Sequence, residues 1–252
     1  MRENKTKTKL KQGQPVMGII SSSTDPMIAE ICGHIGFDYY MIDGEHGAFS
    51  PVDALNIVRA CEIADITPLA RIGSKDPKLV LQYLDTGMQG IMMPGLETAV
   101  EIEMLVQAVK YPPQGKRGLG LGRAANYMLG SGAEQATYVE AANQQTLVLP
   151  LFEDPALLSE LPEMVKVPGV DGFVFGPRDL SMTMGFYDGP NHPQVQSVID
   201  EAIKIIRQSG LFVGTTAGTN QTAKVEIERG ATFILTTIPN LLKQSGTAFL
   251  KP

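Results

Sequence analysis

Length, composition and charge describe an ordinary globular chain and argue against several classes of protein. The 252 residues are 43% hydrophobic and 19% charged, and their formal net charge of −6 argues against nucleic acid or an anionic membrane as a general partner. No apolar run approaches the ~20 residues of a membrane helix, and the two cysteines form no disulfide framework, so we expect a cytoplasmic protein. No linker divides the chain, so we expect one domain over residues 1–252.

Eight short apolar runs, each followed by a helical pattern, set the predicted architecture. The expected strands cover residues 16–20, 39–42, 68–72, 90–93, 146–152, 172–175, 211–214 and 232–235. Three of the intervening helices open with a capping side chain directly before a proline, at Asp25-Pro26, Ser50-Pro51 and Asp76-Pro77. Eight strand-then-helix units predict an α/β fold of the (β/α)8 TIM-barrel type, for which ~250 residues is typical.

Two segments depart from this rhythm. Residues 1–14 are rich in lysine, and we expect either a solvated arm or a short helix across the bottom of the barrel. Residues 111–145 open with a long stretch rich in glycine and proline, which predicts a functional or disordered loop.

Polar residues gather where the predicted strands end. Residues 43–46 follow the second strand, Arg71 ends the third, Glu153 follows the fifth, and Asp179 follows the sixth through a Gly-Pro turn. The carboxyl ends of barrel strands share one mouth, which is where barrel enzymes place their active sites. This pattern predicts a catalytic site.

Glu153 and Asp179 follow neighbouring strands, so their carboxylates should lie close together. Such a pair repels unless a positive charge lies between them, and a hard divalent ion with oxygen ligands would provide it. The alternative is that one carboxylate pairs with Arg71 or another base. Zinc would favour clusters of histidine or cysteine, whereas the three histidines are scattered.

His46 is the candidate general base. Gly44 and Gly47 flank it and allow close approach of backbone and substrate, while histidine exchanges protons readily near neutral pH. Asp85 is a candidate for orienting it, and Arg71 offers a planar fork for a substrate carboxylate or enolate oxygen. His34 and His192 lie near helix ends, where we expect structural roles.

Several motifs in one order resemble the HpcH/HpaI group of class II pyruvate aldolases over residues 16–235. They are Gly36-Phe37-Asp38, Ile42-Asp43-Gly44-Glu45-His46, Leu84-Asp85-Thr86-Gly87, Tyr111-Pro112-Pro113, Arg117-Gly118, Gly169-Val170-Asp171-Gly172 and Gly176-Pro177-Arg178-Asp179-Leu180-Ser181. The resemblance implies a lyase that reversibly cleaves a 4-hydroxy-2-oxo acid to pyruvate and an aldehyde, as in the catabolism of aromatic compounds. Oxaloacetate decarboxylation is an expected side reaction.

The same resemblance implies the ligands of the site. Glu153 and Asp179 would hold a divalent metal, Mg²⁺, Mn²⁺ or Co²⁺, and pyruvate would chelate it. Backbone amides near Arg178 and Asp179 would help, so Gly176, Pro177, Arg178 and Asp179 are the expected substrate-binding residues.

The catalytic roles are also implied by the resemblance. Arg71 would stabilise the pyruvate enolate. His46, with Asp85, would act as the acid and base, and Asp43 would support the water network of the metal. The last helix would be exchanged between subunits, which would assemble as trimers paired into hexamers.

The chain departs from the family pattern at the pocket wall. Leu151 stands where a glutamine is usual, Arg178 stands where an alanine is usual, and the family tryptophan near the first strand is absent. Three other functions therefore stay open. They are a Schiff-base aldolase, for which Lys75 is the nearest candidate, a metal-dependent decarboxylase or lyase of another 2-oxo acid, and a non-catalytic barrel that binds such an acid.

Overall fold

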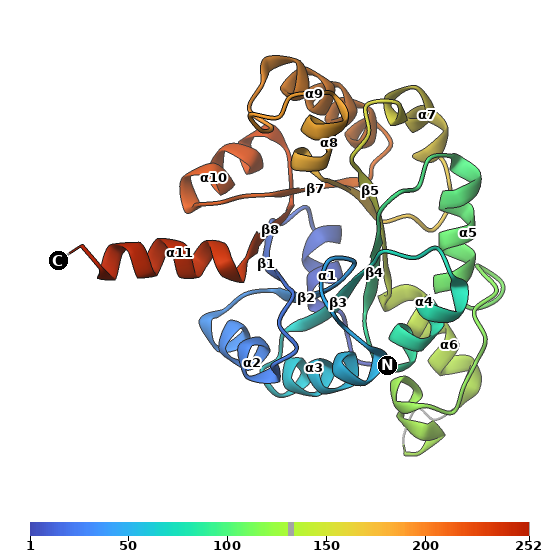
Figure 1. Cartoon of the computed structure of the whole chain (residues 1–252). Coiled ribbons are helices and arrows are strands. Elements are labelled where there is room, and N and C mark those ends of the chain that lie inside the picture. The colour runs from blue at the N-terminus through green and yellow to red at the C-terminus, as the bar shows by residue number, and fades with distance from the viewer. Residues whose placement is uncertain (131–133, 252) are drawn as a thin grey trace.

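Eight parallel strands close into a barrel in the part of the chain that the computed structural model describes, residues 1–130 and 134–251. Each strand pairs with its neighbours in sequence, and β8 returns to pair with β1 (Figure 1). The strands are β1 (Val16–Ser21), β2 (Tyr39–Gly44), β3 (Thr67–Ile72), β4 (Gly90–Met93), β5 (Leu147–Phe152), β6 (Gly172–Phe175), β7 (Phe212–Thr216) and β8 (Phe233–Thr237). The (β/α)8 prediction is confirmed.

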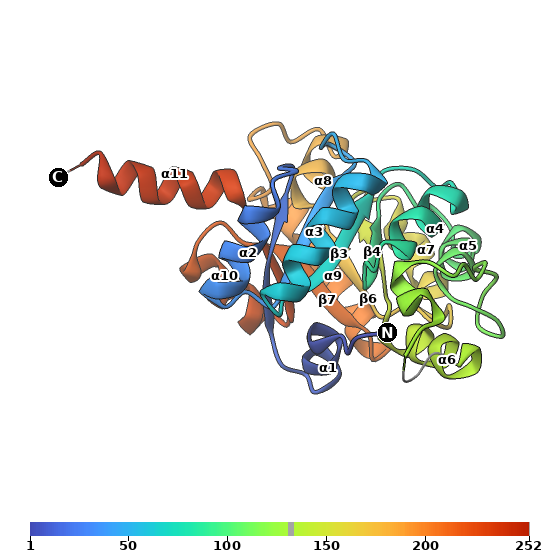
Figure 2. The same cartoon turned by 90° about the horizontal axis from the view of Figure 1, so that it is seen from below.

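Helices surround the barrel in Figures 1 and 2. They are α1 (Lys5–Lys11), α2 (Pro26–Ile35), α3 (Pro51–Ile63), α4 (Pro77–Asp85), α5 (Ala99–Val109), the 3₁₀ helix η1 (Arg123–Met128), α6 (Gln135–Gln145), α7 (Leu157–Met164), α8 (Pro177–Thr183), α9 (Pro193–Gln208), α10 (Asn220–Arg229) and α11 (Ile238–Phe249). Asp25, Ser50 and Asp76 each accept a hydrogen bond from a backbone N–H of the first turn, with a proline next in sequence. The three predicted cap-then-proline starts are confirmed.

Side chains that alternate along each strand divide the core into a layer inside the barrel and a layer between the strands and the helices. In β5, Leu147, Leu149 and Leu151 pack inside the barrel, whereas Val148 and Phe152 pack against the helices. Because side chains alternate along a strand, the next inward position after Leu151 is residue 153, at the mouth. The same alternation places the last residues of the other strands around one opening.

The amino-terminal end of the barrel is closed by α1, which lies below the strands in Figure 2. Thr6, Lys7 and Leu10 are buried, and Lys7 Nζ lies 2.7 Å from Oδ1 of Asp171. Of the two alternatives for the lysine-rich segment, the short helix is therefore correct. Because α1 covers the amino-terminal end, the open mouth of the barrel lies at the carboxyl ends of the strands.

The segment 111–145 differs in part from the predicted loop. It contains η1 and the helix α6, whereas residues 131–133 lie outside the described residues. The helix α6 buries Tyr138, Ala142 and Asn143 and has a weakly apolar sequence, so its periodicity gave little signal. The predicted loop is confirmed over residues 111–122, whereas the helix α6 was not predicted.

The last helix, α11, projects away from the barrel (Figures 1 and 2). None of its residues is buried, and Leu242 and Phe249 are exposed. Across the described residues, none of the helices combines the length and the apolar character needed to cross a membrane.

Candidate active site at the barrel mouth

The register of β2 and β3 places Asp43 directly beside Arg71 at the mouth. Arg71 donates from Nε to Oδ1 of Asp43 at 2.9 Å and from Nη2 to Oδ2 at 2.7 Å. Asp43 Oδ1 also accepts the backbone N–H groups of Glu45 and His46, each at 3.2 Å. One carboxylate thus fixes both the guanidinium and the turn that carries His46.

Electrostatics favour the charged form of Asp43. Burial by itself would raise its pKa, but the hydrogen bonds and positive charge of Arg71, with the two backbone donors, outweigh burial and lower the pKa. The side chains of Arg71 and Asp43 are only 14% and 11% exposed. The pair is therefore a rigid charged element in the wall of the mouth.

Glu45 belongs to this cluster, although no separate role was predicted for it. Its Oε2 lies 3.2 Å from Nη1 of Arg71 and 3.9 Å from Nε2 of His46, and this buried oxygen has no hydrogen-bond partner among the described residues. The available signal was its place in the polar run that follows β2. His46 itself is 66% exposed and open to solvent and ligand.

Glu153 and Asp179 converge over Gly176, where β6 ends and α8 begins. A methyl group on Gly176 would lie 3.5 Å from Oε2 of Glu153 and 3.6 Å from Oδ2 of Asp179. Oε1 of Glu153 accepts the backbone N–H of Gly95 at 2.8 Å, which leaves Oε2 directed at this point. The predicted neighbourhood of the two carboxylates is confirmed, and the absence of a side chain at Gly176 keeps the space between them open.

The carboxylate pair carries uncompensated negative charge. The pKa of Glu153 is raised, first by burial and then by the charges of Glu45 and Asp179, against the lowering effects of the Gly95 N–H and Arg71. The described residues contain no cluster of three or more His, Cys, Asp and Glu side chains able to hold a metal. Two carboxylates fit a hard divalent ion that keeps its other positions for water and substrate oxygens.

Two adjoining cavities open at the mouth, and both are lined by His46 and Asp179. One, of about 320 Å³, also contacts Glu45 and Glu153. The other, of about 410 Å³, contacts Arg71, Leu151 and the turn Gly176, Pro177, Arg178 and Asp179. Asp43 lines neither cavity but holds Arg71, and with the further exception of Asp85 the predicted site residues lie around this common space.

Asp85 lies at the opposite end of the barrel. It ends α4, which runs from the carboxyl end of β3 back toward the start of β4. There Oδ1 of Asp85 accepts a hydrogen bond from Nη2 of Arg117 at 2.8 Å. Within one chain Asp85 therefore pairs with Arg117 and not with His46, and its role in orienting His46 stays a prediction.

The other histidines and the candidate lysine lie outside the mouth. His34 is in the last turn of α2, and His192 caps α9 and stacks on Phe186 at 3.7 Å between ring centroids. Lys75 is paired with Glu101 at 2.6 Å. Burial lowers the pKa of Lys110 to about 7, as a Schiff-base lysine requires, but its Nζ donates to Asn143 and Thr146 carbonyls near the barrel bottom.

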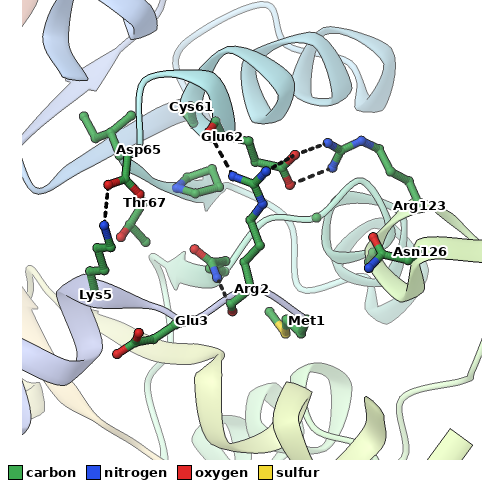
Figure 3. Close-up of a pocket in the computed structure, with 15 residues that line it drawn as sticks. Met1, Arg2, Glu3, Lys5, Cys61, Glu62, Asp65, Thr67, Arg123 and Asn126 are labelled. Carbon is green, nitrogen blue, oxygen red and sulfur yellow. Dashed lines mark hydrogen bonds and ion pairs between the residues drawn. The ribbon is translucent and has the colours of Figure 1, made fainter. Parts of the chain in front are cut away.

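A further cavity of about 250 Å³ lies at the amino-terminal end (Figure 3). Figure 3 shows Glu62 between the guanidinium groups of Arg2 and Arg123, and Lys5 directed at Asp65. Each of these charged side chains therefore has an oppositely charged partner within the chain. The cavity has no converging carboxylates, so the mouth is the better candidate for catalysis.

Comparisons with known proteins identify the family of this chain. The sequence profile of the HpcH/HpaI aldolase/citrate lyase family matches residues 17–238. A 4-hydroxy-2-oxo-heptane-1,7-dioate aldolase of Escherichia coli (strain ATCC 8739) is 36% identical over 92% of this chain and 87% of its own length. The enzyme of that name from Klebsiella pneumoniae is 35% identical over 98% and 92%. The crystal structure of an HpcH/HpaI aldolase from Desulfitobacterium hafniense DCB-2 superposes with a TM-score of 0.91 at 27% identity, covering 97% of this chain and 95% of that one. The chain therefore belongs to the HpcH/HpaI aldolase/citrate lyase family and is an enzyme of the lyase class.

Proposed function

We propose that this enzyme reversibly cleaves a 4-hydroxy-2-oxo acid to pyruvate and an aldehyde, with the help of a divalent metal ion such as Mg²⁺, Mn²⁺ or Co²⁺. The observation that carries the proposal is the convergence of Glu153 and Asp179 over Gly176, beside Arg71. The names of the relatives, aldolases of a 4-hydroxy-2-oxo acid, support the substrate class.

Glu153 and Asp179 would hold the ion in this proposal. When bound, the ion would supply a Lewis acid for the carboxylate and keto oxygens of the pyruvate half of the substrate. The backbone of residues 176–179 lines the same cavity and would contact that half. Because burial and the charges of Glu45 and Asp179 raise the pKa of Glu153, a cation beside it would favour its charged form.

Arg71 would stabilise the enolate that forms when the bond between C3 and C4 breaks. A guanidinium has five N–H donors, and the hydrogen bonds to Asp43 engage two of them, whereas Glu45 contacts Nη1 only as an ion pair. Three donors are left for substrate oxygens. Because Asp43 and Glu45 hold the plane of the group, its charge is preorganised where negative charge develops.

His46 would take the proton from the C4 hydroxyl during cleavage and return it during condensation. It is exposed to both cavities of the mouth, and Glu45 lies beside its Nε2. Asp43 fixes the backbone of the His46 turn. Glu45 and Asp43 therefore take positioning roles, whereas His46 would touch the reacting hydroxyl.

We also propose that copies of this chain assemble through the last helix. The exposed apolar side chains of α11 would be buried if this helix were exchanged between subunits of a trimer or hexamer. A role for Asp85 in orienting His46 would then require the Asp85 of a second copy. Light scattering tests the assembly, and a monomer at micromolar concentration would contradict this part of the proposal.

A screen of 4-hydroxy-2-oxo acids tests the function. Pyruvate release is followed by a coupled lactate dehydrogenase assay before chelation, after chelation and after return of Mn²⁺. We expect release that is lost on chelation and restored by the metal. Borohydride inactivation in the presence of pyruvate would favour a Schiff-base mechanism instead, and binding of pyruvate without any release would favour a non-catalytic barrel.

A further inference from the structure

Two buried lysines meet at the amino-terminal end of the barrel, opposite the mouth. Lys7 belongs to α1, which covers this end, and Lys110 caps the carboxyl end of α5. The two residues are only 6% and 2% exposed. Lysine is almost never fully buried without a partner, because burial removes the water that solvates its charge. The pair therefore depends on groups of the protein that replace this water.

The Nζ atoms of the two lysines converge on one backbone oxygen. Lys7 donates to the carbonyl of Thr146 at 2.8 Å, and Lys110 donates to the same oxygen at 2.6 Å. Lys110 also donates to the carbonyl of Asn143 at 2.7 Å. Lys7 Nζ lies 2.7 Å from Oδ1 of Asp171, which is the one carboxylate among the described residues that forms an ion pair with either lysine. A single negative charge therefore serves two amino groups.

The hydrogen bonds match one ammonium group and one neutral amine. An ammonium group has three N–H donors and no lone pair, whereas a neutral amine has two donors and one lone pair. Lys110 donates to two carbonyl oxygens, which uses both donors of an amine. Lys7 donates to Thr146 and contacts Asp171, and its third N–H is left for the lone pair of Lys110, which its side chain contacts. If both groups were charged, the third N–H of each would face the other cation.

The surroundings of Lys110 favour its neutral form. Burial is the largest cause and the charge of Lys7 is the next, and with Lys11 of α1 they lower the pKa of Lys110 to about 7. Asp171, in the turn before β6, acts in the opposite direction. The end of α6 contributes only neutral carbonyl oxygens to this site. The charge of Lys110 therefore changes near neutral pH.

We propose that these groups form a pH-sensitive latch, in which Lys110 is a neutral amine while α1 is docked and takes up a proton when α1 leaves. Departure of α1 removes the charge of Lys7 and admits water to Lys110. Asp171 then becomes the counterion of Lys110. Docking of α1 and protonation of Lys110 therefore oppose each other. The latch lies at the end of the barrel opposite the proposed catalytic residues and goes beyond the proposed function.

The pH dependence of docking has a definite sign. Between the lowered pKa of Lys110, about 7, and the ordinary lysine value of about 10.4, the undocked state binds one proton that the docked state lacks. A fall of one pH unit within this range should therefore raise the equilibrium constant for undocking of α1 by about tenfold. Below the lowered pKa both states bind the proton, so the constant should level off.

Hydrogen exchange of the backbone amides of α1, measured by mass spectrometry at pH 6, 7, 8 and 9, tests the latch. Dividing each rate by the intrinsic exchange rate at that pH gives the undocking constant. The proteins are wild type, Lys110→Met, which removes the titrating group, and Lys110→Arg, which keeps a permanent charge. Lys9→Met, which changes an exposed lysine of the same helix, is the control. The helix α9, whose buried residues are all apolar, is the reference in each protein.

For wild type we expect the undocking constant to fall roughly fiftyfold from pH 7 to pH 9 and only about twofold from pH 6 to pH 7. Lys9→Met should keep this profile, whereas Lys110→Met should lose it. Lys110→Arg should undock more than wild type at pH 9 and show no step, and if it fails to fold, wild type and Lys110→Met still decide the question.

Three results would overturn the inference. The first is a wild-type undocking constant that does not vary with pH, or that varies only as α9 does. The second is a Lys110→Met constant that varies as the wild-type constant does. The third is an absence of protection in α1 at every pH, because the helix would then not be docked in solution.

Discussion

The pair of Arg71 and Asp43 gives a prediction that can be worked from the structure. In Arg71→Ala, the Asp43 carboxylate stays in a site where its side chain is 11% exposed and loses both guanidinium donors. Removing one partner of a buried pair costs about 3–5 kcal/mol. Because the mouth is partly open to water, we expect a loss at the low end of this range, about 3 kcal/mol, which corresponds to about 6–12 °C in Tm.

The pH dependence of this loss has a definite sign. The pKa of Asp43 is lowered in the folded protein, so its contribution is present above the unfolded value of about 3.9 and disappears as the pH falls through the folded value. The difference in stability between wild type and Arg71→Ala should therefore be largest near pH 7 and shrink below about pH 4. Adding Asp43→Asn to Arg71→Ala should recover about 1 kcal/mol or more, because it removes the unpaired charge.

Thermal unfolding in the presence of a chelator measures these differences. The chain contains no tryptophan, so far-UV circular dichroism at fixed protein concentration is a suitable probe. Lys75→Ala is the matched control, since it breaks an ion pair of 2.6 Å whose side chains are 45% and 29% exposed and should cost at most about 1 kcal/mol. If Arg71→Ala costs no more than Lys75→Ala, or its cost is the same at pH 7 and pH 3, the reasoning about the pair is refuted.

Three further predictions follow from the site. His46→Ala should slow aldol cleavage by ~100- to 10,000-fold while changing the apparent affinity for pyruvate little, and an unchanged cleavage rate would place the base elsewhere. Asp179→Asn should weaken metal binding. Mn²⁺ at 100 times the wild-type Kd stabilises the wild-type protein by about 2.7 kcal/mol and should raise the Tm of the variant much less. An equal rise in Tm would contradict the role of Asp179 as a ligand. Glu153→Gln should raise the Tm of the metal-free protein near neutral pH. Because the pKa of Glu153 is raised in the folded state, ionisation of this carboxyl group destabilises the folded protein as the pH rises. A Tm of Glu153→Gln below that of wild type would refute this expectation.

Local signals in the sequence predicted much of the fold. Ser50-Pro51 and Asp76-Pro77 mark helix starts because the capping oxygen and the fixed φ of proline act within one turn. Short apolar runs predicted each strand, with errors of one or two residues at the ends. In contrast, α6 has a polar sequence that packs through only a few residues, so periodicity did not reveal it.

The site was predictable where strand ends determine position. Glu153 and Asp179 meet because parallel neighbours end at one mouth, and that rule needs only the order of the strands. Asp85 was placed correctly at the end of a helix, but that end lies one helix length from the mouth, so strand order could not place it beside His46. Glu45 was missed because its importance depends on the exact direction of Arg71, which three-dimensional contacts alone reveal.

Deuterium exchange at the pyruvate methyl group tests the central claim most directly, since it needs only the metal, the carboxylate ligands and the base. The wild-type enzyme is assayed by NMR in D₂O after chelation, after return of Mn²⁺, and in parallel with Glu153→Gln. We expect loss of exchange on chelation, recovery with Mn²⁺, and little exchange by Glu153→Gln at the same metal concentration. Full exchange by thoroughly chelated wild-type enzyme would contradict the metal mechanism.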